Sequence, residues 1–325
     1  MKKILGIGNA LVDILAVFDS EDMLEKYKLP KGSMTHVDEI TTNKILADIK
    51  QQSKYDIVAG GSAANTINGL SKLGIKSAFI GKIGKDEIGD FFLGDMLKNG
   101  AEPKLITADK TSGNCKVLIT PDGERTMCTY LGAAIDLCAE DLCKEQFEGY
   151  DYFHIEGYLV QNHALMLRSF ELAKQQGMTV SLDMASFNVV AENKAFLEEV
   201  LHKYVDIIFA NEEEAKTFTG REPCEALNVF SEICNIAIVK MGPAGSYVKQ
   251  KNEVYKIHPI SAKAIDATGA GDLYASGFLY GLAKNLPLNI CGDIGSLCAG
   301  KIVEVIGTKL NHESWSYIRK KLCGN

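Results

Sequence analysis

The sequence predicts an α/β protein in which a mostly parallel sheet is covered by helices on both faces. Apolar, β-prone runs recur every 27 to 30 residues, which is the length of a strand–helix–strand unit. The segments between these runs carry helical patterns near 163–176 and 193–204. Continuous apolar strands that alternate with helices are typical of parallel sheets buried on both faces. The strand runs lie at 152–155, 179–182, 206–209 and 236–239.

The other elements follow from local patterns. Residues 1–8 contain an apolar run too short for a secretory signal, and we interpret it as the first strand. The β-prone runs 115–120 and 125–130 flank a Pro-Asp-Gly-Glu turn and predict a hairpin. A second hairpin is predicted from 246–249 and 253–258.

Composition excludes several classes of protein. Of the 325 residues, 46% are hydrophobic and 24% are charged, and no apolar run approaches the ~20 residues of a membrane span. A net charge of −7 argues against nucleic-acid binding, which requires a basic face. The nine cysteines form neither a CxxC pair nor a His/Cys cluster, so they indicate reduced thiols. We therefore expect a cytoplasmic protein that binds neither membranes nor nucleic acid.

The segment 266–272, Asp-Ala-Thr-Gly-Ala-Gly-Asp, carries the strongest functional signal. Apolar residues at 275, 278, 279 and 282 predict an amphipathic helix directly after it. Free backbone N–H groups and the helix dipole at such an N-terminus bind anions, so Gly269, Ala270 and Gly271 are expected to hold a transferring phosphoryl group. Asp272 is placed to take the proton of an attacking hydroxyl. An acid in the first turn is also favoured by the dipole alone.

This segment resembles the C-terminal signature of the ribokinase-like (PfkB) carbohydrate and nucleoside kinases. The segment 60–66, Gly-Gly-Ser-Ala-Ala-Asn-Thr, resembles their N-terminal signature. The resemblance implies a three-layer α/β/α fold as one domain over 1–325, with a small β lid from about 14–40 and 105–131. It also implies an enzyme that uses ATP and Mg²⁺ to phosphorylate a hydroxymethyl group of a sugar or nucleoside. A homodimer through the lid is compatible with this fold.

The acceptor is expected to bind at four residues near the first strand. Asp13 lies among apolar neighbours, where burial is costly unless hydrogen bonds satisfy the carboxylate, and vicinal hydroxyls of a sugar could do so. Gly60 and Gly61 let the backbone close on a sugar ring, and Asn65 both donates and accepts hydrogen bonds. In the family that the sequence resembles, residues matching Asp13, Gly61 and Asn65 hold the sugar. An alternative for Asp13 is a turn or capping acid.

The donor nucleotide is expected at the ends of later strands. Asn211 and Glu214 lie on one helix face, where they could hold Mg²⁺ through water, although a helix cap followed by acids explains them equally. The family resemblance assigns nucleotide contacts to the loop that contains Lys240, Gly242 and Gly245.

Two further predictions concern cations near the 266–272 segment. Asp266 and Thr268 match family positions associated with a monovalent cation, which implies potassium. Arg125 in the hairpin could reach a phosphate, but an arginine there is typical of a solvated face.

Other classes fit the sequence less well. The segment 6–11 has Gly6 and Gly8 but lacks the third glycine of a dinucleotide-binding fingerprint, and no P-loop is present. A non-catalytic sugar or nucleotide sensor on the same fold would be favoured by loss of Asp272 or the glycines, and all of them are present. The segment 8–14 resembles adenosine kinases, whereas 183–188 resembles general sugar kinases, so the acceptor stays open between a sugar and a nucleoside.

Overall fold

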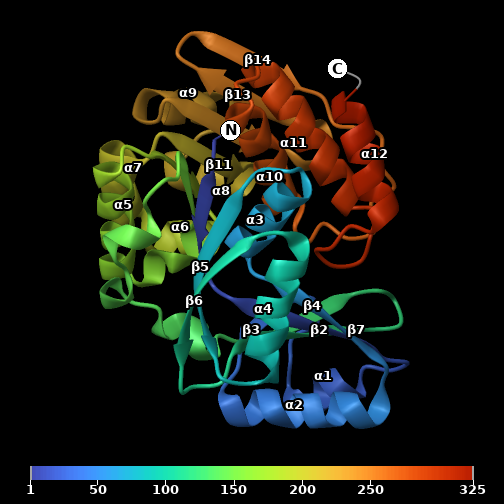
Figure 1. The fold of residues 1–325 in the computed structure, drawn as a ribbon. Coiled ribbons are helices and arrows are strands. Elements are labelled where there is room, and N and C mark those ends of the chain that lie inside the picture. Colours follow the sequence, from blue (N-terminus) through green and yellow to red (C-terminus); the bar gives the residue numbers. More distant parts are fainter. Residues whose placement is uncertain (1, 324–325) are drawn as a thin grey trace.

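The computed structural model describes residues 2–323 and contains two sheets of unequal size (Figure 1). In the described residues the large sheet has nine strands in the order β14-β13-β12-β11-β10-β9-β1-β5-β6. Neighbours from β12 to β6 are parallel, whereas β13 and β14 add an antiparallel edge. The strands are β1 Ile4–Ile7, β5 Ser77–Gly84, β6 Glu102–Ala108, β9 Tyr152–Glu156, β10 Thr179–Asp183, β11 Ile207–Asn211, β12 Ile236–Lys240, β13 Ser246–Gln250 and β14 Glu253–Ile257.

The predicted α/β alternation is confirmed. The four apolar runs form β9, β10, β11 and β12, and the first strand forms as β1. The helices predicted between the runs form at His163–Gln175 and Lys194–Tyr204. The second hairpin forms as β13 and β14 and extends the large sheet at its edge.

Helices cover both faces of the large sheet and produce a three-layer ribokinase-like fold (Figure 1). One face packs against α5 His163–Gln175, α6 Phe187–Glu192, α7 Lys194–Tyr204, α8 Glu212–Thr219 and α9 Pro223–Ile233. The other packs against α3 Ser62–Lys72, α4 Glu87–Asn99, α10 Ala270–Ala283 and α11 Leu288–Ile302. The last helix, α12 His312–Cys323, packs outside α10 and α11. Short 3₁₀ turns lie at Gly132–Asp136, Ala139–Asp141, Lys144–Gln146, Gly157–Gln161 and Gly242–Ala244.

The small sheet, which we call the lid, lies at one end of the molecule (Figure 1). Its strand order is β3-β8-β7-β2-β4, and the first predicted hairpin is confirmed as β7 and β8. The side chains on one side of the sheet pack with α1 and α2 into a separate apolar core, and those on the other side face the large sheet. Its elements are β2 Leu11–Val17, α1 Asp22–Tyr27, β3 Met34–His36, α2 Glu39–Gln52, β4 Tyr55–Gly60, β7 Gly113–Ile119 and β8 Arg125–Tyr130.

The predicted lid boundaries need one correction at each segment. Residues 105–108 were expected in the lid, but they belong to β6, which pairs in parallel with β5 in the large sheet. Conversely, the first lid segment continues beyond residue 40, because α2 and β4 complete the small sheet. Both boundaries depend on which strands pair across distant segments of the chain, and local sequence patterns do not show this pairing.

The carboxyl ends of the parallel strands point toward the lid side of the large sheet. β9, β10, β11 and β12 end at Glu156, Asp183, Asn211 and Lys240, and each of these residues lines one cavity. Ligands of open α/β sheets bind beyond the carboxyl ends of the strands. The cavity is therefore where this topology places a site.

Candidate active site

The segment 266–272 turns into the N-terminus of α10, as predicted. Gly269 precedes the helix with a φ of +77°, a left-handed conformation that favours glycine. A Cβ at Gly269 would lie 3.1 Å from the Thr308 methyl group, so the turn also packs closely. The amides of Gly269 and Gly271 have no hydrogen-bond partner among the described residues.

One expected anion-binding amide is already in use. The N–H of Ala270 donates to the carbonyl of Ala267 at 3.1 Å, which closes a turn of the loop. Of the three amides predicted to bind the anion, those of Gly269 and Gly271 are therefore free among the described residues, and that of Ala270 is not. Lys240 lies beside them, because a Cβ on Gly271 would sit 3.1 Å from its Nζ.

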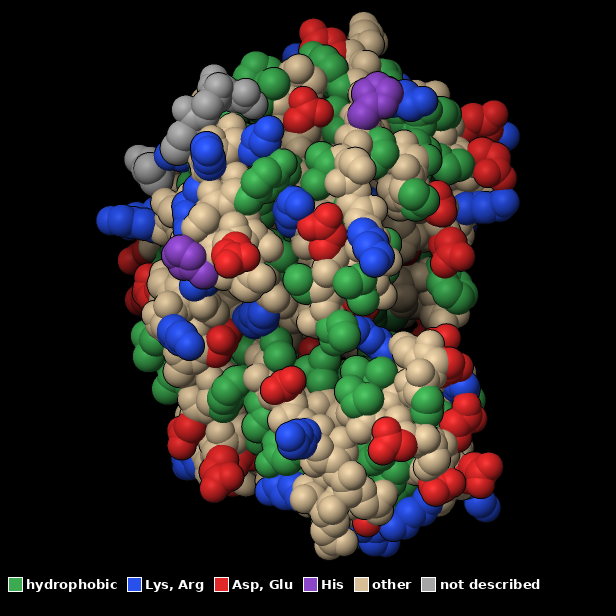
Figure 2. All heavy atoms as spheres, turned by 90° about the vertical axis from the view of Figure 1, so that its right-hand side faces the viewer, with side chains coloured by type: hydrophobic (Ala, Val, Ile, Leu, Met, Phe, Trp, Pro, Cys, Tyr) green, Lys and Arg blue, Asp and Glu red, His purple; other side chains and the backbone are tan. Residues whose placement is uncertain are grey.

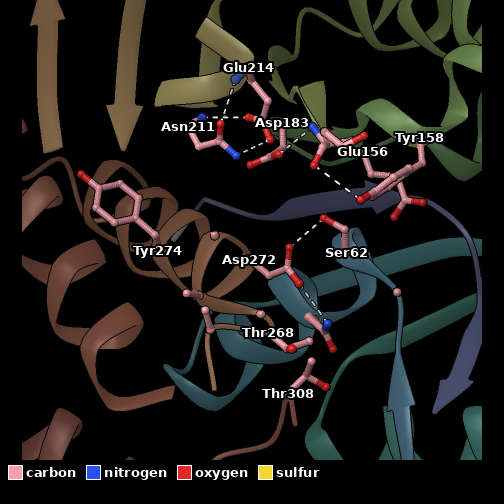
Figure 3. A pocket seen from close by; sticks show the side chains of 18 of the residues that line it. Ser62, Glu156, Tyr158, Asp183, Asn211, Glu214, Thr268, Asp272, Tyr274 and Thr308 are labelled. Atoms are coloured by element: carbon pink, nitrogen blue, oxygen red, sulfur yellow. Dashed lines mark hydrogen bonds between the residues drawn. The ribbon is translucent and has the colours of Figure 1, made fainter. Parts of the chain in front are cut away.

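Asp272 lies in the cavity with both carboxylate oxygens hydrogen-bonded (Figure 3). Ser62 Oγ donates to Oδ1 at 2.7 Å, and Asn65 Nδ2 donates to Oδ2 at 2.9 Å. Burial raises the pKa of Asp272 to about 6, while the bonds from Asn65 and Ser62 lower it. The carboxylate is therefore mostly ionised at neutral pH and more basic than an exposed aspartate.

The predicted acceptor residues lie together on the lid side of Asp272. Asp13 on β2 lines the cavity, and burial raises its pKa to about 7 against the opposing charge of Lys309. Asn65 Oδ1 is buried and has no hydrogen-bond partner in the described part of the chain. Both oxygen groups are thus available to hydroxyl donors.

The paired glycines are required by close backbone approach. A Cβ on Gly60 would lie 2.6 Å from Asp13 Oδ2. Gly61 has a φ of +93°, and a Cβ there would lie 2.2 Å from the carbonyl oxygen of Asn9. A side chain at Gly60 would displace Asp13, and one at Gly61 would displace the backbone of Asn9.

Asn211 and Glu214 form a reciprocal cap at the start of α8. Asn211 Oδ1 accepts from the Glu214 N–H, and both Glu214 oxygens accept from Asn211, at 2.7 to 2.8 Å (Figure 3). Burial, followed by the neighbouring charge of Asp183, raises the pKa of Glu214 to about 7. The contacts of Asn211 and Glu214 in this structure are therefore those of a helix cap, which was the alternative to a metal site.

Lys240 is the central cation where the sequence predicts the donor nucleotide. Its Nζ donates to Asp183 Oδ2 at 2.9 Å, and both side chains are largely buried. Burial opposes the charge, yet Asp183 and Glu214 keep the pKa of Lys240 above its usual value. Gly242 and Gly245 line the same cavity, and Gly245 has a φ of +93° where a Cβ would clash with the Ile257 carbonyl.

These groups surround one cavity of about 1200 Å³ between the large sheet and the lid. The space-filling view shows the surface indented where the two parts meet (Figure 2). Lys240 lies among three carboxylates, those of Asp183, Glu214 and Asp272, so negative side chains outnumber positive ones in this part of the cavity. Such an excess of buried carboxylates fits a bound divalent cation. Among the described residues, no three His, Cys, Asp or Glu side chains gather as ready ligands.

Two side chains that the sequence analysis left out are part of the site. Ser62 lies within the 60–66 signature, and only the structure reveals that it contacts Asp272. Glu156, buried at the end of β9, accepts from the N–H and Nδ2 of Asn9 and from the N–H of Ala63 at 2.7 to 2.9 Å. Its place directly after the strand run 152–155 is a signal that could have found it, because ligands bind beyond the carboxyl ends of such strands.

Arg125 is not on a solvated face. Its side chain is 16% exposed, and Nη1 forms an ion pair with Asp266 and donates to Thr268 Oγ1 at 3.3 Å. The expectation of a solvated arginine was wrong, because the hairpin folds back onto the 266–272 segment.

Residues 32–315 match the sequence pattern described as pfkB family carbohydrate kinase. The chain belongs to this family. A solved probable sugar kinase from Rhizobium etli is 30% identical, with a TM-score of 0.88 over 99% of this chain and 98% of the other. The adenosine kinase of Sinorhizobium meliloti is 29% identical, with a TM-score of 0.87 over 98% and 99%. The adenosine kinase of Saccharomyces cerevisiae is 28% identical over 96% of this chain and 97% of its own.

As a pfkB family member, the protein is a kinase that transfers the γ-phosphate of ATP to a hydroxymethyl group of a sugar or nucleoside. The family implies ATP as donor and Mg²⁺ as its counter-ion. In the described residues no helix is long and apolar enough to cross a membrane.

Proposed function

We propose that this kinase is a nucleoside kinase and that a purine nucleoside of the adenosine type is its acceptor. The observation that carries the proposal is the apolar lining of the cavity on the lid side. A free pentose carries hydroxyls around its ring and offers little surface to apolar side chains, whereas a purine base offers two flat apolar faces. The apolar residues that line the cavity from the lid are Leu11, Met34 and Met127, and those from the turns after β8 and β9 are Leu131, Ile135, Leu137 and Tyr158.

The ribose would bind between this lining and Asp272. Asp13 would accept a hydrogen bond from one of the two vicinal hydroxyls, and the unpartnered Asn65 Oδ1 would accept one from the other. Gly60 and Gly61 would bring the backbone against the ring. The remaining hydroxymethyl group would then lie at the Asp272 carboxylate, which Ser62 and Asn65 orient.

Asp272 would act as the general base. It would accept the hydroxyl proton as the hydroxyl oxygen bonds to the γ-phosphorus and the bond from phosphorus to the β–γ bridging oxygen breaks, releasing ADP. The amides of Gly269 and Gly271 would stabilise the charge on the transferring group, and Lys240 beside them would add a positive charge. The Ala270 amide would join them only if its hydrogen bond to the Ala267 carbonyl opened.

Asn211 and Glu214 would hold Mg²⁺ through water at the donor end. The ion would neutralise phosphate charge when bound. The excess of carboxylates over Lys240 supports this placement. Gly242 and Gly245 would let the nucleotide approach the backbone of the loop after β12.

A small sugar is the second candidate acceptor. Asp13, Asn65 and Glu156 supply polar groups that any sugar could use, and relatives of similar identity include a ribokinase from Staphylococcus aureus and a 5-dehydro-2-deoxygluconokinase from Bacillus velezensis, both 28% identical. A non-catalytic sensor is disfavoured, because Asp272 is present and is oriented by two hydrogen bonds.

The acceptor is tested by measuring ADP formation from Mg·ATP with adenosine, inosine, cytidine, ribose, fructose and fructose 1-phosphate. A base that buries about 120 Å² contributes ~3 kcal/mol at ~25 cal/mol per Å², or about 100-fold in affinity. We therefore expect kcat/KM for adenosine to exceed that for ribose by about 100-fold. Equal values, or a sugar as the best acceptor, would replace the nucleoside assignment with the sugar one.

A homodimer through the lid and a cytoplasmic location stay predictions. Since α1 and α2 cover one side of the lid sheet and the cavity lies on the other, a lid dimer would form at the edge strands β3 or β4. Ile57 on β4 is 42% exposed and would lie in such a contact. Light scattering of the wild type and of Ile57→Lys tests this arrangement.

A further inference from the structure

The carboxylate of Asp266 is fully occupied by donors of the chain itself. Oδ1 accepts from the N–H of Thr268 at 3.0 Å and from its hydroxyl at 2.7 Å. Oδ2 accepts from the N–H of Gly307 at 2.7 Å and forms the ion pair with Arg125. Burial opposes ionisation, but these donors keep the pKa of Asp266 below its usual value. A carboxylate has about four acceptor positions, so none is left over.

The arginine comes from a distant part of the chain. Arg125 begins β8 in the lid hairpin, whereas Asp266 and Thr268 belong to the loop before α10. Its Nη1 contacts both residues, and the Asp266 side chain is only 5% exposed. The guanidinium spans a small gap between lid and loop that is also lined by Asp13 and Gly307.

This arrangement leaves no place for the monovalent cation expected at Asp266 and Thr268. A metal cation binds through free oxygen lone pairs. The Asp266 oxygens have none, and the Thr268 hydroxyl donates to Asp266 while it accepts from Arg125. The residues present therefore do not fit potassium at this position. The Arg125 guanidinium already supplies the positive charge that balances Asp266.

We propose that the Arg125 guanidinium is the built-in cation of the 266–272 loop and replaces a monovalent metal ion. It neutralises Asp266 close to the amides of Gly269 and Gly271, where a second negative charge would repel the triphosphate. It also fixes the Asp266–Thr268 turn from which Gly269 enters its left-handed conformation. Arg125 is thus a positioning residue of the anion-binding loop, supplied by the lid.

The test compares salts at constant ionic strength, with choline chloride replaced stepwise by KCl. The proteins are the wild type, Arg125→Met, Arg125→Lys and the control Lys31→Met, whose lysine pairs with Glu21 and Asp122 inside the lid. The readouts are the affinity for Mg·AMP-PNP by calorimetry and the melting temperature. Neither readout needs an acceptor, so the result is independent of the nucleoside assignment.

We expect wild type, Arg125→Lys and Lys31→Met to bind Mg·AMP-PNP with affinities that change less than twofold between the two salts. Arg125→Met should bind about tenfold more weakly in choline chloride, because a buried carboxylate has lost its partner. KCl should restore part of that affinity and raise the melting temperature of this variant alone. Millimolar guanidinium chloride should do the same by refilling the site.

Two results would overturn the proposal. One is a wild-type protein whose affinity or melting temperature rises markedly with KCl, since a resident guanidinium leaves no place for the ion. The other is an Arg125→Met protein that binds equally well in both salts. The wild-type titration decides the question even where the methionine variant does not fold.

Discussion

Replacing Asp272 by Asn should make this kinase more stable while removing most of its activity. The carboxylate has a pKa of about 6 in the folded protein against an ordinary value of 3.8. Its charged form is therefore less stable in the folded state than in the unfolded state. Asparagine fills the same volume, keeps partners for Ser62 and Asn65, and carries no charge.

The size of the stability gain follows from the pKa difference. About two units at ~1.36 kcal/mol per unit give at most about 3 kcal/mol, reduced where the carboxylate contacts solvent in the cavity. Because the folded pKa is raised, the wild type loses this free energy as pH rises from about 4 through 6. The variant does not titrate, so its advantage should be absent at pH 4 and complete above pH 7.

Melting curves of both proteins from pH 4 to 8 measure this difference. With an unfolding entropy of ~2.1 cal/mol/K per residue and 325 residues, 3 kcal/mol corresponds to a shift on the order of 4 °C. Turnover should fall by ~10²–10⁴ if the carboxylate acts as general base. Unchanged Mg·AMP-PNP affinity is the control for an intact donor site.

Two outcomes would refute the reasoning. A melting difference that does not depend on pH would mean that burial does not penalise the Asp272 charge. Near-normal turnover would mean that no proton passes to this carboxylate in the rate-limiting step.

Two further substitutions test the surroundings of Asp272. Ser62→Ala removes a hydrogen bond that favours the charged form of Asp272, so the acid limb of the profile of kcat/KM against pH should move up by about one pH unit. The control Ser71→Ala, on the same helix, should leave the acid limb in place. Lys240→Met leaves Asp183 buried without its partner and should lower the free energy of unfolding, measured with urea, by about 3 kcal/mol. Adding Asp183→Asn should recover most of this loss. A double variant as unstable as the single one would contradict the pairing.

The α/β core was predictable because its signals are local. Four apolar strand runs and two helical patterns were placed within a few residues of their observed bounds. The lid was predictable only in part. Its hairpin has a turn signature, but the pairing of β2 with β4 and the transfer of β6 to the large sheet depend on contacts between distant segments.

The candidate site divides in the same way. Glycine motifs report backbone geometry directly, so Gly61 and Gly269 were found and indeed have positive φ values. The contacts of Ser62 and Arg125 were not predictable, because their partners lie far away in the sequence. Nothing in a pattern of charges distinguishes an arginine in water from one that faces a buried carboxylate.

The lid joins the rest of the chain through four short connections: β1 to β2, β4 to α3, β6 to β7 and β8 to the 3₁₀ turn at Gly132–Asp136. Three of them contain Asn9, Gly61 or Leu131, all of which line the cavity. Because the lid has its own apolar core, a rotation of the lid as one body would leave that core buried. Such a rotation would bend these connections and change the shape of the cavity at the same time. A ligand that contacts both the lid and the large sheet would therefore favour one position of the lid over the others.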